Sequence, residues 1–307
     1  MTGVRPNHAR PSAELITVRD WIRYANTELD RAPLHFGHGT DEAWDEAVAL
    51  IGGWLRIPPD RLETMLDARV LAGEGEQLLA LLRRRIDERV PVPYLVGRAW
   101  QVGLEFVVDE RVLVPRSPIA QLLDDGLDPW LGDRVPRRIL DLCTGSGCLG
   151  IVAALVFPEA EVVLADVSED ALAVAADNVR RFGLGDRVTT VASDGLEAFA
   201  GAEPFDLVIC NPPYVNAADL AAMPAEFRAE PSLALAGGED GLDPVARWLP
   251  DIARLLGEAG LLVLELGNSA PALLERFPAL DVVWPELEQG GVGVVLVERG
   301  ALDAGLL

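Results

Sequence analysis

From Arg137 onward, short apolar segments alternate with amphipathic segments of helical length. This alternation constrains the fold more than any other feature of the chain. Strands that alternate with helices of about 10–15 residues predict an open, largely parallel α/β sheet. The last two expected strands, 281–284 and 293–298, are joined by too few residues for a parallel crossover, so at least one must be antiparallel. The predicted fold class is therefore α/β.

The first part of the chain has a different pattern. Apolar residues recur at helical spacing from residue 14 to 90, and one of these helices is expected to start with Thr40 or Asp41 as its N-cap. Residues 104–115 alternate around Asp109-Glu110, which predicts a β-hairpin. The expected organisation is a loose tail (1–11), a helical domain (12–100), a hairpin linker (101–120) and the α/β domain (121–307).

Charge and composition narrow the classes of partner and location. The chain has 49 acidic and 26 basic residues, a net charge of −23, and every basic residue is arginine. Such a surface repels phosphate backbones and attracts basic partners, so free nucleic acid is not expected as a substrate. Three cysteines, no secretory signal and no apolar run long enough to span a bilayer predict a cytoplasmic protein without a membrane segment.

The segment "ILDLCTGSGCLGIVAAL" predicts a strand, a glycine-rich turn and a helix. Gly145, Gly147 and Gly150 fit the G-x-G-x-x-G pattern of nucleotide-binding turns. The next strand ends at Asp166, 25 residues after Asp141, where a carboxylate can accept hydrogen bonds from a ribose diol. Asp194 follows the third strand, where an adenine amino group is expected. These residues predict a cofactor that contains a nucleoside.

The glycine turn fits both a nicotinamide dehydrogenase and a methyltransferase that uses S-adenosylmethionine. Asp141 favours the second, because an acid before the turn can pair with the ammonium of the methyl donor, which a dinucleotide lacks. All three histidines lie in the helical part, so the α/β part lacks the usual proton donor of a hydroxyl dehydrogenase. His35 and His38 have no suitable further ligands near them, and no metal site is expected.

The fourth strand of the α/β part stops at Asn211-Pro212-Pro213-Tyr214. Pro212 favours an extended Asn211, and two fixed acceptors result, the Asn211 side-chain oxygen and the Pro212 carbonyl oxygen. Together they suit a planar –NH₂ group, and Tyr214 offers a face for stacking. The motif predicts methylation of a planar amine or amide, and the target can be adenine, cytosine or glutamine.

Several long segments give the chain a family resemblance. The glycine turn, "NPPYV" and "EFRAEPSLALAGGEDGL" resemble the N(5)-glutamine methyltransferases of the HemK/PrmB type. Residues 36–47, 88–100, 109–119 and 264–269 resemble the PrmB branch, which methylates a glutamine of large-subunit ribosomal protein L-three. The sister branch acts on the Gly-Gly-Gln loop of peptide release factors, and it usually has Pro-Glu-Thr at Ser117-Pro118 and a glycine at Cys143.

The resemblance implies a helical substrate-recognition domain and a Rossmann-like class I methyltransferase domain with a seven-stranded sheet. It also implies that S-adenosylmethionine is the cofactor and that Asn211 to Tyr214 bind the substrate amide, with Asn211, Pro212 and Tyr214 catalytic. The expected cofactor-binding residues are Asp141, Cys143, Thr144, Gly145, Ser146, Gly147, Asp166, Asp194 and Asn211. Gly195 departs from relatives, which often have a bulky residue there, so adenine packing from this position is not expected.

The function expected from the sequence is therefore a protein-(glutamine-N5) methyltransferase acting on ribosomal protein L-three, either free or in a ribosome assembly intermediate. One alternative is the same chemistry on peptide release factors. Two further alternatives are an amino-methyltransferase of nucleic acid and a non-catalytic ribosome assembly factor.

Overall fold

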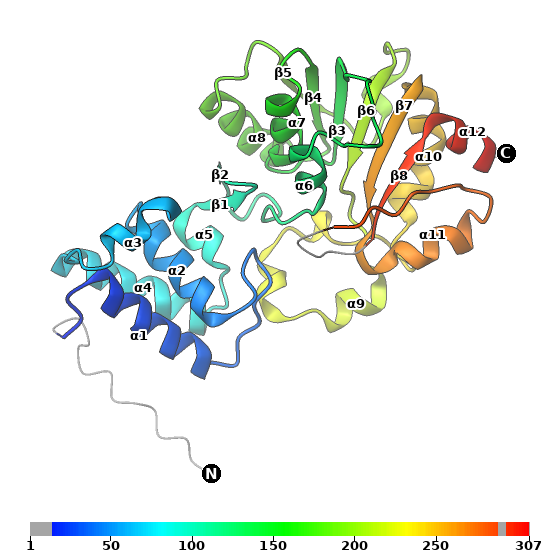
Figure 1. The fold of residues 1–307 in the computed structure, drawn as a ribbon. Coiled ribbons are helices and arrows are strands. Elements are labelled where there is room, and N and C mark those ends of the chain that lie inside the picture. The colour runs from blue at the N-terminus through cyan, green and yellow to red at the C-terminus, as the bar shows by residue number, and fades with distance from the viewer. Residues whose placement is uncertain (1–13, 288–292, 307) are drawn as a thin grey trace. The chain divides into compact units, whose positions relative to one another are not determined.

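The computed structural model describes residues 14–287 and 293–306, and the predicted tail (1–11) lies outside them. Figure 1 shows the chain from its helical N-terminal part to the sheet-containing remainder. The chain divides into two compact units: the first comprises Met1–Arg98 together with Ala225–Ala229, and the second comprises Ala99–Pro224 and Glu230–Leu307. Five residues of the first unit, Ala225–Ala229, are therefore inserted in the sequence of the second unit.

The first unit is built from short helices around an apolar core. Trp21, Ile22, Leu50 and Leu78 are among the buried residues of this core. The α-helices are α1 (Val18–Arg31), α2 (Ala43–Trp54), α3 (Leu62–Met65), α4 (Ala72–Asp87) and α5 (Val92–Val96), and the 3-10 helices are Pro59–Arg61 and Ala225–Ala229. The expected start of α2 is off by a residue or two: its N-cap is Glu42, which makes no side-chain capping bond.

A buried charge cluster joins the inserted segment to this unit. Arg85, which is fully buried, donates from Nε and Nη2 to the two carboxylate oxygens of Glu46, both at 3.0 Å. Glu226 of the inserted segment accepts from the His35 N–H at 3.0 Å and from Arg89 Nη1 at 2.8 Å. Burial opposes ionisation of Glu226, but these donors lower its pKa to about 2. The inserted segment is therefore held by an ionised carboxylate.

The second unit contains a six-stranded sheet in the order β5-β4-β3-β6-β7-β8. All neighbouring pairs are parallel except β7 and β8, which are antiparallel, so the prediction of a mostly parallel α/β sheet with an antiparallel strand at its end is confirmed. The strands are β3 (Arg138–Leu142), β4 (Glu161–Asp166), β5 (Val188–Ala192), β6 (Phe205–Cys210), β7 (Leu256–Glu265) and β8 (Val294–Glu298).

Helices cover the sheet, and residues of β3 alternate between its two faces. Leu140 and Leu142 belong to the core that also contains the apolar residues of α10 and α12. Asp141 faces the other way, toward Gly150 of α7. Figure 1 shows α7 and α8 along β3, β4 and β5. The α-helices of the unit are α6 (Ile119–Asp124), α7 (Cys148–Val156), α8 (Glu169–Arg181), α9 (Ala217–Ala222), α10 (Asp243–Leu255), α11 (Ala270–Arg276) and α12 (Arg299–Gly305).

Two elements differ from the sequence-based expectation. The hairpin comes earlier, as β1 (Arg98–Gln101) and β2 (Leu104–Val107), because Val102 and Gly103 both adopt positive φ and form the turn. Asp109 instead accepts the N–H of Arg111 two residues later in a local turn. Within the described residues the sheet has six strands rather than seven.

The expected seventh strand at 281–284 is reduced to a single bridge. Val283 and Leu296 of β8 exchange two backbone hydrogen bonds of 2.9 Å. Pro285 follows, and because proline has no N–H it cannot extend this ladder.

Candidate active site

Three adjacent strands end side by side, and each end carries a residue with a polar side chain. Leu142 at the end of β3 is paired with Cys210 at the end of β6, and Cys210 is paired with Leu264 of β7. The residues that come next are Cys143, Asn211 and Glu265. In open α/β sheets this edge, beyond the carboxyl ends of the strands, is where ligands bind. Because β6 pairs with β3, Asn211 lies beside the glycine turn.

The glycine turn connects β3 to α7, and hydrogen bonds to the side chain of Asp141 hold it in place. One carboxylate oxygen of Asp141 accepts from the Thr144 hydroxyl at 2.5 Å and from the Gly150 N–H at 2.9 Å. A Cβ at Gly150 would lie 2.2 Å from the Leu164 side chain, so only glycine permits this close approach of helix and sheet. Asp141 is 1 % exposed and does not line the cavity described below.

The second oxygen of Asp141 has a different environment. It is buried and has no hydrogen-bond partner among the described residues. Burial raises the pKa of Asp141 to about 7, against the effect of its two donors. A buried carboxylate oxygen without a donor is the kind of group that an ammonium would satisfy.

Asp166 ends β4 and stands beside the turn. Its two oxygens accept the N–H groups of Gly145 at 3.0 Å and Ser168 at 2.9 Å. Each carboxylate oxygen has a further lone pair, so Asp166 can still accept hydroxyl groups from a ligand. Asp194 follows β5, the strand next to β4, and forms an ion pair with Arg247 of α10.

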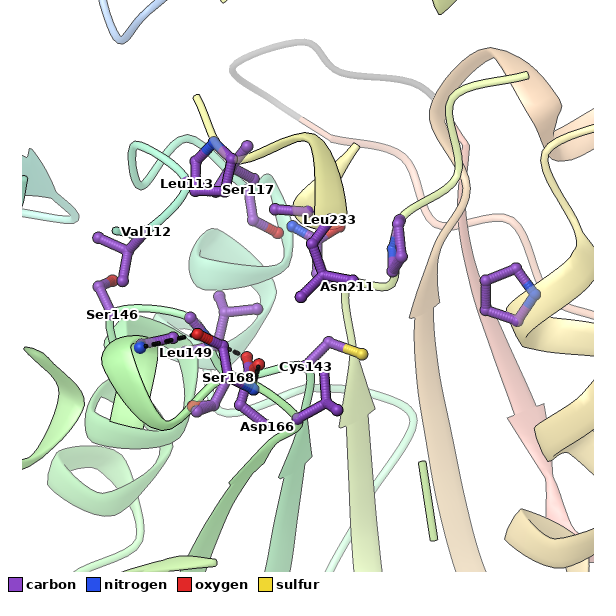
Figure 2. A pocket seen from close by; sticks show the side chains of 18 of the residues that line it. Val112, Leu113, Ser117, Cys143, Ser146, Leu149, Asp166, Ser168, Asn211 and Leu233 are labelled. Atoms are coloured by element: carbon purple, nitrogen blue, oxygen red, sulfur yellow. Dashed lines mark hydrogen bonds between the residues drawn. The ribbon is translucent and has the colours of Figure 1, made fainter. Parts of the chain in front are cut away.

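A cavity of about 630 Å³ opens at this edge of the sheet, and all of its lining residues belong to the second unit. Figure 2 shows Cys143 and Asp166 on the strand side of the cavity, with Ser117 and Leu233 across from them and Asn211 beside them. Of the residues expected from the sequence, the following line it: Cys143, Thr144, Gly145, Ser146, Asp166, Asp194, Asn211 and Pro213. Asp141, Gly147, Pro212 and Tyr214 are not among the lining residues.

Tyr214 is held in place by the buried carboxylate of Glu265, a residue that was not predicted from the sequence. Its hydroxyl donates to Oε1 of Glu265 at 2.8 Å, and its carbonyl accepts from the Ser269 hydroxyl at 2.8 Å. The Ser117 hydroxyl donates to the other oxygen of Glu265. Burial raises the pKa of Glu265, although both hydroxyl donors oppose that shift. Glu265 thereby joins the end of β6 to the segment before α6.

The segment before α6 is anchored by a second carboxylate. Arg116 makes two hydrogen bonds to Glu230, at 2.6 and 2.8 Å, and the Val114 N–H donates to Glu230 at 3.0 Å. Arg116 and Ser117 both line the cavity. This pairing holds residues 114–117 as part of the cavity wall.

The thiols near the turn are held in their neutral form. A hydrogen bond with Cys210, together with burial, raises the pKa of Cys143 well above its usual range. Burial and nearby Asp141 raise the pKa of Cys148 to about 12. All three cysteines are free. Cys143 adopts φ +60°, a conformation that favours glycine, which is the residue that the sister branch has there.

Comparisons with known proteins identify the family of this chain. Residues 123–235 match the family model described as "Methyltransferase small domain". A ribosomal protein uL3 glutamine methyltransferase of Bordetella pertussis is 50% identical over 94% of this chain and 97% of its own length. Proteins of the same name from Burkholderia pseudomallei and Neisseria gonorrhoeae are 46% and 44% identical, over 94% of this chain and 96% of their own lengths. This chain belongs to the uL3 glutamine methyltransferase family.

Membership of this family makes the chain a methyltransferase and confirms the predicted PrmB branch. The catalytic domain of hMettl16, solved with the MAT2A 3'UTR hairpin 6, is 19% identical to the chain. It matches with a TM-score of 0.50 over 73% of this chain and 80% of its own. That likeness supports the class I methyltransferase fold alone. No helix in the described part of the chain is long and apolar enough to cross a membrane.

Several cavity residues of this family member were not predicted from sequence. They include Arg111 to Val114, Leu233, Arg247 and Trp248. Arg111 to Val114 and Leu233 lie in segments that carry the family resemblance, which did not assign them a role, and helical spacing identified α10 but not which of its residues face a ligand. Glu265 lies in the resemblance segment 264–269, but a single acid at the end of an apolar strand has no distinctive spacing that would predict its role.

Proposed function

We propose that this protein transfers a methyl group from S-adenosylmethionine to the side-chain amide nitrogen of a glutamine in ribosomal protein uL3. The observation that carries the proposal is the placement of Asn211 beside the glycine turn, at the ends of the paired strands β6 and β3. The names of relatives at 44–50% identity supply the substrate. We place the reaction in the cytoplasm, where ribosomal proteins are made.

The residues around the cavity fit a donor that contains a nucleoside and an ammonium. Asp166 has free lone pairs for a ribose diol, and the unpartnered oxygen of Asp141 can receive the ammonium behind the turn. Residues 143–147 bring backbone close to the ligand, and Asp194 lies one strand further along the edge. When bound, the sulfonium supplies an electrophilic methyl group that needs no metal or strong base.

The substrate amide is positioned by the end of β6. The side-chain oxygen of Asn211 and the carbonyl oxygen of Pro212 accept the two hydrogens of the glutamine –NH₂ group. Holding both hydrogens directs the nitrogen toward the methyl group, and positioning of this kind lowers the barrier by up to about 7–11 kcal/mol in favourable cases. Tyr214 supports the loop and packs beside the amide, and solvent or a weak acceptor takes the proton after transfer.

Charge supports a basic protein as the substrate. The net charge of −23 attracts basic partners and disfavours free nucleic acid. Both free uL3 and a ribosome assembly intermediate that contains uL3 satisfy this argument. Peptide release factors remain the competing protein substrate, because the same site geometry would accept their glutamine.

The decisive experiment compares substrates directly. The protein is incubated with S-adenosylmethionine labelled in its methyl group, and with purified uL3, a peptide release factor or ribosomal RNA. We expect label on one glutamine of uL3 and none on the other two, and a uL3 variant with that glutamine changed to alanine should stay unlabelled. Label on the release factor but not on uL3 would overturn the substrate assignment.

A further inference from the structure

The side chain of Trp248 fills the space that a Cβ atom at Gly195 would occupy. Gly195 follows Asp194 and has φ +58°. A Cβ built at Gly195 would lie 2.1 Å from Nε1 of the Trp248 indole, far inside van der Waals contact. Trp248 comes from α10, more than fifty residues later in the chain. A tryptophan from another element therefore occupies the volume that a side chain at position 195 would need.

Trp248 also borders the cavity at the end where Asp194 lies. It lines the cavity with Asp194 and Arg247, and it is 8 % exposed. Its indole N–H has no hydrogen-bond partner among the described residues. Trp248, Asp194 and Arg247 also line a second cavity of about 630 Å³.

The position of Trp248 along the sheet edge indicates which part of a nucleoside it meets. Asp166 ends β4, and Asp194 follows β5, the strand paired with β4. If the ribose diol binds Asp166, the base extends toward Asp194 and reaches the cavity wall that Trp248 forms. Arg247 lies with its guanidinium carbon 5.6 Å from the centroid of the Trp248 ring and pairs with Asp194. The indole thus offers an apolar surface in the part of the cavity wall that the base would reach.

We propose that Trp248 packs against the adenine ring of the donor and replaces the missing side chain of Gly195. The proposal rests on the proposed function, in that the donor is S-adenosylmethionine. Aromatic rings in contact contribute about 0.5–1.5 kcal/mol beyond the area that they bury. Gly195 and Trp248 depend on each other: position 195 must be glycine because Trp248 fills the space that a side chain there would need.

The first test measures binding of S-adenosylhomocysteine by titration calorimetry, without any turnover. Trp248→Leu should weaken binding about tenfold, and Trp248→Phe only about threefold, since phenylalanine keeps an aromatic surface. Trp284→Phe is the matched control, because Trp284 is 43 % exposed and lies outside the cavity lining. The control should bind like the wild type.

Tryptophan emission provides a second readout on the same samples. Adenine packed on Trp248 should quench its emission on saturation, so the quench should disappear in Trp248→Phe and persist in Trp284→Phe. Binding and quenching that are both unchanged in Trp248→Phe would overturn the assignment of Trp248 while leaving the donor in place. A wild-type protein that does not bind S-adenosylhomocysteine would overturn the donor class and this assignment together.

A double-mutant cycle tests the pairing of the two residues. Gly195→Ala should weaken S-adenosylhomocysteine binding at least about tenfold in the wild type but less than about threefold in Trp248→Leu, where the clash is relieved. The backbone strain at φ +58° is common to both backgrounds and cancels in the cycle. Thermal unfolding of all four proteins shows whether the clash lowers stability instead, and an equal effect of Gly195→Ala in both backgrounds on binding and on stability would overturn the pairing.

Discussion

The ends of β3 and β6 lie side by side, and a buried carboxylate supports each, but the two are assembled differently. Asp141 binds Thr144 and Gly150, which belong to its own turn and the helix that follows. Glu265 binds Ser117 and Tyr214, which are 148 and 51 residues away in the chain. The first strand end is a local structure, whereas the second forms only when three distant segments meet. The glycine turn on the donor side is therefore locally encoded, and the substrate side depends on tertiary structure.

The largest effect is expected from the substrate side. Asn211→Ala removes one of the two acceptors proposed for the amide, and turnover should fall about 10²–10³-fold, by analogy with the loss of one oxyanion-hole donor. Binding of S-adenosylhomocysteine should stay near that of the wild type. The rate of methyl transfer to uL3 at saturating donor measures turnover, and titration calorimetry measures the binding of S-adenosylhomocysteine.

Asn216→Ala is the matched control for this change. Asn216 lies five residues further along the same segment, where its side chain caps α9 by accepting the Asp219 N–H. It should cost about 1 kcal/mol of stability at most and little turnover. Equal turnover in the Asn211 variant and the wild type would contradict the positioning of the amide by Asn211.

On the donor side, Asp141→Asn should weaken S-adenosylhomocysteine about 10–100-fold, because it removes the charge proposed to receive the ammonium. It should also change the pH dependence of stability. The pKa of Asp141 is raised to about 7 by burial, so between about pH 4 and 7 the folded protein holds a proton that the unfolded chain releases. This contribution to stability is present below about pH 4 and is lost as the pH rises through 7.

Thermal unfolding of the two proteins across this pH range measures the second effect. The midpoint of Asp141→Asn relative to the wild type should rise from about pH 4 to 7 and then level off. If only this pH dependence changes and donor binding does not, Asp141 shapes the turn without touching the ammonium. The ends of β3 and β6 would then differ only in how their carboxylates hold the following loops in place.

Glu265→Gln tests the tertiary support of the substrate side. Glutamine has one acceptor oxygen and one –NH₂ donor in place of two acceptor oxygens, so the hydroxyl of either Ser117 or Tyr214 must accept a hydrogen bond where it now donates one. We expect turnover to fall about tenfold while donor binding stays unchanged. Since burial raises the pKa of Glu265, wild-type turnover should rise with pH as this carboxyl ionises, and the variant should lack that rise. A variant that retains the wild-type pH profile would show that Glu265 does not govern the position of Tyr214.

The smallest effects come from removing one hydroxyl donor at each carboxylate. Thr144→Val should weaken donor binding a few-fold and leave turnover at saturation nearly unchanged. Ser117→Ala should lower turnover a few-fold and leave donor binding nearly unchanged. Donor titrations and turnover rates of both variants, measured in parallel, give the comparison. The same effect in both variants would mean that the two strand ends are not separate in function.

The same contrast explains how much of the molecule the sequence alone could predict. The α/β class, the glycine turn and the place of Asp166 at the end of its strand depend on spacing within one segment, and the structure has them as expected. The hairpin was misplaced because a turn at Val102-Gly103 competes with one at Asp109, and local pattern does not decide between them. Glu265 and Trp248 were missed because their roles depend on contacts with residues far away in the chain.

The five residues Ala225–Ala229 carry a consequence for exchanging parts between family members. The chain passes from one unit to the other after Arg98, after Pro224 and after Ala229, and Glu226 supplies a buried carboxylate to the helical unit. A fragment that stops at Arg98 would leave Arg89 without this partner and would also remove the carboxylate that lies 3.6 Å from the guanidinium of fully buried Arg85. A chimera that transplants the helical unit must therefore carry a second, short piece of its donor sequence, taken from between α9 and α10.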